Sequence, residues 1–175
     1  EQNAAVCAGC HGQAGQKPIM GSYPKLSGLG EKYLYNQLVA IQSGDRAIAE
    51  MTGLLSGKSE QELQDLAAYF DNQEMPLSQA NPDLIEQGAA LYRGGNMASG
   101  VPACAGCHSP QGKGNEPGGY PRLSGQNAEY ISKQLNAYRG GERATGSNAA
   151  IMMDVAAKLT DAEIEAVANY VSGLH

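Results

Sequence analysis

Cys7-Ala8-Gly9-Cys10-His11 recurs unchanged as Cys104-Ala105-Gly106-Cys107-His108 in this chain of 175 residues. Two cysteines separated by two residues and followed by a histidine form the attachment pattern of a c-type haem, because the thiols bond the porphyrin and the histidine binds its iron. The two copies predict two covalently bound haem c groups. The thioether-forming residues would be Cys7, Cys10, Cys104 and Cys107. The first axial iron ligands would be His11 and His108.

Two other kinds of site use a Cys-x-x-Cys pair. A thioredoxin-type redox pair occurs near a βαβ pattern, and no strand-like alternating run precedes either copy. A zinc site needs a compact set of ligands, whereas the two pairs are 97 residues apart and each has its own histidine. The spacing therefore favours haem attachment, which uses all four cysteines and leaves none for a disulfide.

An internal repeat extends over almost the whole chain. Residues 7–46 match residues 104–143 at an offset of 97. Residues 63–70 then match residues 164–171 at an offset of 101, because the second copy has four additional residues around 144–150. A match of this extent predicts one small fold that is present twice.

The repeat also predicts the domain boundaries. We expect a first domain over residues 1–72, a linker over residues 73–82 and a second domain over residues 83–175. The linker is polar and contains two prolines. Because proline restricts the chain, we expect a semi-rigid connection that holds the two domains in a fixed relation.

Each copy has the pattern of helices joined by Gly-rich loops, so the predicted fold class is all-α. A short helix over residues 2–11 would carry the first cysteines, and residues 83–93 would open the second domain. Residues 31–42 have their large apolar side chains on one helical stripe. The last helix of each copy is predicted by a capping box, Ser59-x-x-Glu62 in the first and Thr160-x-x-Glu163 in the second.

The second axial ligand decides the chemistry of a haem. Histidine opposite methionine suits electron transfer, whereas an open iron suits gas binding or peroxide chemistry. Met51 precedes Ser59 by eight residues, and Met152 precedes Thr160 by the same eight. This matched position favours Met51 and Met152. Met153 is the rival to Met152, since spacing alone does not separate a ligand from its neighbour.

The remaining methionines, Met20, Met75 and Met97, have no methionine at the matching position of the other copy. They are interpreted as side chains that fill gaps in the apolar cores.

Two further pairs of repeated residues suit supporting roles. Pro24 and Pro121 could present the carbonyl that accepts a hydrogen bond from the iron-bound histidine, although a Pro-bearing turn is an equally ordinary interpretation. Arg46 and Arg143 could pair with haem propionates through the guanidinium fork. A solvated arginine at a helix end is the alternative.

Charge and hydropathy exclude some classes of function. The net charge is −6, with 5 basic and 9 acidic side chains in residues 1–78 and 7 and 9 in residues 79–175. Nucleic acid is therefore not expected as a partner. The sequence has no run of about 20 apolar residues, so no transmembrane segment is predicted. We also expect that any signal peptide has already been removed.

With the repeated Pro-x-Leu-Ser-Gly loop, the Ala-Ala-Tyr-Phe and Ala-Asn-Tyr-Val helices and the final Ser-Gly-Leu-His, these features resemble the cytochrome c4 family of periplasmic dihaem cytochromes. The resemblance implies two small all-α cytochrome domains related by an approximate two-fold axis, with their haems close together. It implies ligand pairs His11 with Met51 and His108 with Met152. One departure is Ser-Gly-Leu-Gly at residues 27–30, where the second copy has Ser-Gly-Gln-Asn, which is closer to the usual pattern.

The resemblance implies a soluble periplasmic electron carrier that transforms no substrate. Its donor would be a quinol-oxidising complex or another redox protein, its acceptor a terminal oxidase, and it would associate loosely with the membrane. The alternative is a cytochrome subunit of a larger oxidoreductase, such as a flavocytochrome. A dihaem peroxidase is less favoured, because the matched methionines leave no iron open and no internal histidine is spare.

Overall fold

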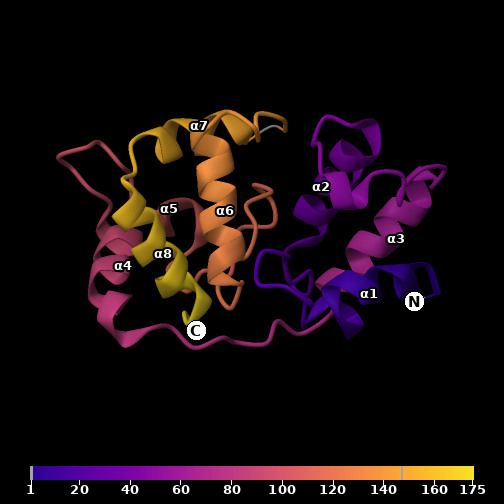
Figure 1. The fold of residues 1–175 in the computed structure, drawn as a ribbon, viewed down its shortest axis with the longest axis horizontal. Helices are drawn as coiled ribbons and strands as arrows, with labels where there is room; N and C mark the ends of the chain where they lie inside the picture. Colours follow the sequence, from indigo (N-terminus) through magenta and orange to yellow (C-terminus); the bar gives the residue numbers. More distant parts are fainter. Residues whose placement is uncertain (1, 147) are drawn as a thin grey trace.

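The computed structural model describes residues 2–146 and 148–175. Within these residues the chain is helical, with isolated β-bridges and no strand, so the predicted all-α class is confirmed. Figure 1 shows two groups of helices joined by one extended segment. Residue 1 of the predicted first domain and residue 147 of the predicted insertion lie outside the described residues. None of the helices described is long and apolar enough to cross a membrane.

The first group of helices is built around α2 and α3, which pack against each other. Leu34 of α2 and Leu66 and Phe70 of α3 lie in one buried cluster. The segment predicted as a helix over residues 2–11 begins as a 3-10 helix and becomes α-helical only at the cysteine motif. The elements of this group are η1 (Gln2–Cys7), α1 (Ala8–His11), η2 (Gln13–Gly15), α2 (Glu31–Ser43), η3 (Ala49–Met51) and α3 (Glu60–Asp71).

The second group is larger, and its core lies between α4, α6 and α8. Gly88 lets α4 approach α8 closely, because a Cβ atom there would collide with the backbone oxygen of Ala166. The elements are α4 (Pro82–Gly94), α5 (Ala105–His108), α6 (Ala128–Arg139), α7 (Ala149–Ala157) and α8 (Asp161–Ser172). The helix α7 was not predicted from the sequence. Its residues are almost all apolar, so they show no amphipathic stripe that would mark a helix.

Both predicted capping boxes are present. Ser59 caps the N-terminus of α3 and Thr160 caps that of α8, and each side chain accepts a hydrogen bond from the backbone N–H of the glutamate three residues later. Each glutamate in turn accepts from the N–H of its cap residue at 2.9 Å. The local sequence therefore determines where the last helix of each repeat starts.

The segment between α3 and α4 lies against both groups of helices. Nζ of Lys25 donates hydrogen bonds to the carbonyl of Pro76 at 2.8 Å and to the hydroxyl of Ser78 at 2.9 Å. The same ammonium group donates to the carbonyl of Gly125 at 2.7 Å. One buried lysine of the first repeat thus holds the connecting segment and the second repeat together. The helix α4 already begins at Pro82, the last residue of the predicted linker.

Candidate functional site

Two cavities of nearly equal size occupy corresponding positions in the two repeats, with volumes of about 500 and 490 Å³. The 490 Å³ cavity is lined by Cys7, Cys10, His11 and Met51. The 500 Å³ cavity is lined by Cys104, Cys107, His108 and Met152. Met153, the rival to Met152, is not among the residues that line either cavity.

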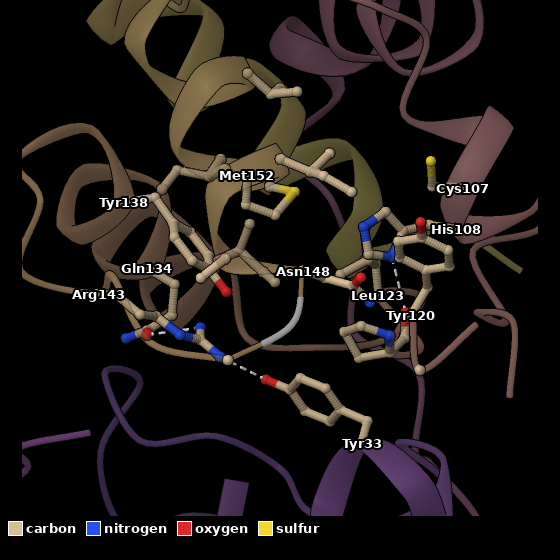
Figure 2. A pocket seen from close by; sticks show the side chains of 18 of the residues that line it. Tyr33, Cys107, His108, Tyr120, Leu123, Gln134, Tyr138, Arg143, Asn148 and Met152 are labelled. Carbon is tan, nitrogen blue, oxygen red and sulfur yellow. Dashed lines mark hydrogen bonds between the residues drawn. The ribbon is translucent and has the colours of Figure 1, made fainter. Parts of the chain in front are cut away.

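His108 and Met152 face one another in the second cavity. Figure 2 shows the imidazole of His108 and the sulfur of Met152 on opposite sides of the open space, with the sulfur of Cys107 beyond the imidazole. Met152 comes from α7, whereas His108 ends the short helix α5. The missed helix α7 is therefore the element that brings this methionine to the cavity.

Each cavity histidine is oriented by a proline carbonyl. Nδ1 of His11 lies 2.9 Å from the carbonyl oxygen of Pro24, and Nδ1 of His108 lies 2.9 Å from that of Pro121. Because a carbonyl only accepts, Nδ1 carries the hydrogen and Nε2 is left with a lone pair for a metal. Burial lowers the pKa of both histidines, against the effect of the carbonyl contact, and favours the neutral imidazole that a metal requires.

The cysteines do not have the properties of a thioredoxin-type pair. None of the four is in a disulfide. Burial raises the pKa of the Cys7 thiol and raises that of Cys104 to about 11, whereas a redox pair needs a low-pKa thiolate. Across residues 2–146 and 148–175, no cluster of three or more His, Cys, Asp or Glu side chains could hold a bare metal ion. The zinc interpretation therefore fails.

The donor set of each cavity fits a haem. Two thiols lie beside an imidazole, a thioether lines the same space, and the walls are mostly aliphatic and aromatic. Such walls suit a flat apolar ring, and thiol, imidazole and thioether are the groups that hold haem c.

Arg143 lies at the boundary between the two repeats. Its guanidinium donates hydrogen bonds to Oε1 of Gln134 at 2.8 Å, to the hydroxyl of Tyr33 at 2.8 Å and to Oε1 of Gln37 at 3.1 Å. Figure 2 shows it reaching from the second cavity toward Tyr33 of the first repeat. It stacks over the ring of Tyr138, 4.7 Å from the centroid. Because Arg143 is 7% exposed, a solvated helix-end arginine is the wrong interpretation for it.

Arg46 makes the matching set of contacts from the first repeat to the second. It donates to Oε1 of Gln37 at 2.7 Å, to Oε1 of Gln134 at 3.0 Å and to the hydroxyl of Tyr130 at 3.2 Å. Burial works to raise the pKa of Tyr130, but the charges of Arg46 and Arg143 lower it below its ordinary value. In the described part of the chain, neither guanidinium pairs with a carboxylate.

No role was predicted from the sequence for the tyrosines and glutamines of this network. The signal was available, because Tyr33 with Tyr130 and Gln37 with Gln134 are each related by the offset of 97. A repeated residue can serve packing within each domain as readily as contact between the domains. Only the structure shows that these residues of the two copies contact one another.

The remaining methionines divide into two kinds. Met75 is buried in the first core, as expected of a gap-filling side chain. Met20 is 52% exposed and Met97 is 93% exposed, so the core interpretation is wrong for both. Each belongs to an irregular segment that keeps the side chain at the surface.

Comparison with known proteins agrees with this geometry. The family model for cytochrome c matches the chain twice, over residues 2–74 and 85–175. Cytochrome c4 from Pseudomonas aeruginosa is 48% identical over 175 residues, covering all of this chain and 87% of that protein. The crystal structure of reduced recombinant cytochrome c4 from Pseudomonas stutzeri superposes with a TM-score of 0.96 at 44% identity, covering 99% of this chain and 96% of that one.

A longer relative shares the same fold. Thiosulfate dehydrogenase from Marichromatium purpuratum is 30% identical with a TM-score of 0.85, and the match covers 97% of this chain but 36% of that chain. The two full-length relatives carry more weight, because they match this chain over nearly their whole length. The chain therefore belongs to the cytochrome c4 family, as an electron carrier with two covalently bound haem c groups, and it is not an enzyme.

Proposed function

We propose that the two cavities are the haem sites and that their ligand sets match. Cys7 and Cys10 would form the thioethers of the first haem, and His11 and Met51 would bind its iron. Cys104 and Cys107 would form the thioethers of the second haem, and His108 and Met152 would bind its iron. The supporting observation is that each cavity brings one Cys-x-x-Cys-His motif together with the methionine at the matching repeat position.

The chain's own residues set the properties of these sites. When bound, each haem supplies a one-electron ferric–ferrous couple. The carbonyls of Pro24 and Pro121 fix the imidazole planes and increase the basicity of the histidines. Arg46 and Arg143 would donate hydrogen bonds to the haem propionates, and the propionates would provide the negative charge that these guanidinium groups otherwise lack. Arg143 lines both cavities and Arg46 lines the first, which supports this role.

The domain boundaries are part of the same proposal. The first haem domain comprises residues 1–72, the linker residues 73–82 and the second haem domain residues 83–175. The family model supports this division by matching twice, on either side of residues 75–84. Limited proteolysis of the holoprotein tests it, since a first cut inside either haem domain would contradict these boundaries.

The proposed physiological role is periplasmic electron transfer. The protein accepts electrons from a quinol-oxidising complex or another donor, passes them to a terminal oxidase and associates loosely with the membrane. A net charge of −6 supports docking on basic partner surfaces. Transfer to a purified oxidase should then slow as ionic strength rises, and rates that stay flat with salt would contradict electrostatic docking.

Absorption spectra of the oxidised and reduced protein test the ligand assignment, together with a haem count and addition of carbon monoxide. We expect two haems per chain, both low-spin, the weak far-red band of Met-ligated ferric iron and no reaction with carbon monoxide. A high-spin haem, or rapid carbon monoxide binding, would mean an open iron and would overturn the ligand assignment.

A second candidate role is the electron-accepting part of a larger oxidoreductase. The observation that favours it is the match to about a third of a thiosulfate dehydrogenase chain. Purification from the native cells distinguishes the roles. A copurifying enzyme that reduces both haems with thiosulfate, or a copurifying flavoprotein that reduces them with sulfide, would support the subunit role. Isolation of the chain alone, with neither reductant active, would contradict it.

A further inference from the structure

The peptide group between Pro24 and Lys25 is hydrogen-bonded at both of its ends. Its carbonyl accepts from Nδ1 of His11 at 2.9 Å, and its N–H donates to Oε1 of Gln126 at 2.9 Å. Gln126 belongs to the second domain and is 1% exposed. A single amide therefore connects the histidine of one haem site to a side chain of the other domain.

Gln126 is held firmly in this position. Its Nε2 donates to the carbonyl of Lys25 at 2.9 Å, so the side-chain amide pairs with both backbone polar groups of that residue. Its Oε1 also accepts from the backbone N–H of Asn127 at 2.9 Å. Rotation of the Gln126 amide would leave several buried groups without partners, which makes the contact to the Pro24–Lys25 peptide a fixed feature.

The second haem site has a different arrangement at the matching peptide. The carbonyl of Pro121 accepts from His108, while the N–H of Arg122 donates to the backbone carbonyl of Leu29 at 3.2 Å. Leu29 is the repeat equivalent of Gln126, at the offset of 97. The departure of Ser-Gly-Leu-Gly from Ser-Gly-Gln-Asn thus has a structural consequence. The peptide N–H after the proline donates to a side-chain amide at the first site and to a backbone carbonyl at the second.

We infer that Gln126 is a positioning residue that tunes the first haem from the opposite domain, acting through the Pro24–Lys25 peptide on His11. An amide whose N–H is hydrogen-bonded has a more polarised carbonyl, because hydrogen bonds in a chain strengthen one another. A stronger acceptor at Nδ1 makes the imidazole a better electron donor to the iron. Gln126 therefore favours the ferric state of the first haem and lowers its reduction potential.

Gln126→Met is the variant that tests this inference, since it keeps a side chain of similar length and removes the acceptor. We expect the potential of the first haem to rise, and by more than any change at the second haem, whose cavity Gln126 also lines, in an NMR redox titration that assigns the signals of each haem. Asn127→Ala is the matched control. It removes the hydrogen bond from Nδ2 of Asn127 to the carbonyl of Tyr23, which crosses the same boundary without involving the Pro24–Lys25 peptide.

Equal shifts in Gln126→Met and Asn127→Ala would mean that only the interface had loosened, and would overturn the inference. An unchanged first potential, or equal shifts of both haems in Gln126→Met, would do the same.

The chemical shift of the His11 Nδ1 proton in the reduced holoprotein is a second, local measurement. We expect it to move upfield in Gln126→Met and downfield in Gln126→Glu, where a carboxylate is the stronger acceptor. If Gln126→Met fails to fold, Gln126→Glu still tests the inference, because an unchanged chemical shift in that variant would contradict it.

The inference rests on the proposed ligation of the first haem by His11, and the wild-type oxidised protein tests that assignment separately. Hyperfine-shifted ring signals of His11 are expected. Their absence would overturn the ligand assignment, whereas their presence with no effect of either Gln126 variant would overturn the inference alone.

Discussion

The hydroxyl of Tyr33 in α2 accepts a 2.8 Å hydrogen bond from the guanidinium of Arg143, which belongs to the opposite domain. The matching pair, Arg46 and Tyr130, makes the same contact in reverse at 3.2 Å. An arginine from the segment after α2 thus binds the tyrosine of α6, and an arginine from the segment after α6 binds the tyrosine of α2, at the boundary between the two haem sites. Because the guanidinium groups line the cavities as well, this boundary connects interdomain packing to the charge around each haem.

Arg143→Gln should lower the reduction potential of the second haem. The substitution removes a buried positive charge beside the cavity, and loss of positive charge favours the ferric state. Removal of a buried unit charge that lines the cavity changes the free energy of reduction by on the order of 1 kcal/mol at an effective dielectric of about 20. That energy corresponds to a fall of about 40 mV for a one-electron couple. A spectroelectrochemical titration measures it.

Arg139→Gln is the control for this prediction. Arg139 is the last residue of α6, four residues before Arg143, and it pairs with exposed Asp161 at the surface. The potential should change little in this variant, because solvent screens the charge. Similar shifts in both variants would show that the effect comes from net charge and not from the buried network.

Met152→Leu should leave the second haem without its sixth ligand, whereas Met153→Leu should not. Leucine keeps the apolar volume of methionine but has no donor atom. In Met152→Leu we expect a high-spin fraction of about one haem in two, carbon monoxide binding at that haem and a fall in its potential. The opposite result, with Met153→Leu opening the iron, would transfer the ligand assignment to Met153.

Gly88→Ala should destabilise the second domain, because the added Cβ would collide with the backbone oxygen of Ala166 in α8. Overpacking of this kind costs about 1–3 kcal/mol. Gly94→Ala is the matched control in the same helix, since a Cβ there has no atom within 4 Å. It should be neutral or stabilising by up to about 1 kcal/mol. Chemical denaturation of the holoprotein, followed by circular dichroism, compares the two, and equal stabilities would refute the close α4–α8 contact.

The fold could be predicted from the sequence wherever the signal was local or repeated. The cysteine motifs, the helix α2 and the capping boxes at Ser59 and Thr160 each depend on residues within a few positions of one another. The helix α7 was missed because an almost wholly apolar stretch has no amphipathic period. Its position beside the cavity depends on tertiary packing.

The interdomain contacts could not be predicted for a different reason. Lys25, Gln126 and the Tyr33–Arg143 pair act across about 100 residues of sequence, and each satisfies its hydrogen bonds only when the two repeats meet. The repeat related each of these positions to a position in the other copy. It did not show which of these positions would face each other across the boundary between the domains.

The capping box at the start of α8 should make part of the stability dependent on pH. The backbone N–H of Thr160 donates to the carboxylate of Glu163, and this hydrogen bond, followed by one from Asn96, lowers the pKa of Glu163 below its ordinary value of 4.5. A carboxylate whose pKa is lower in the folded state stabilises the fold above the unfolded pKa, and the contribution is lost as the pH falls through the folded value.

Glu163→Gln should therefore lower stability at neutral pH by less than about 1 kcal/mol, because the site is largely exposed, and should flatten the loss of stability below about pH 4.5. Glu165→Gln on the same helix controls for the change of charge, since Glu165 is exposed and outside the capping box. Thermal unfolding of the holoprotein between pH 3 and 7 compares the three proteins. If the acid limb of Glu163→Gln had the same slope as that of the wild type, the capping carboxylate would not be the group whose protonation destabilises α8.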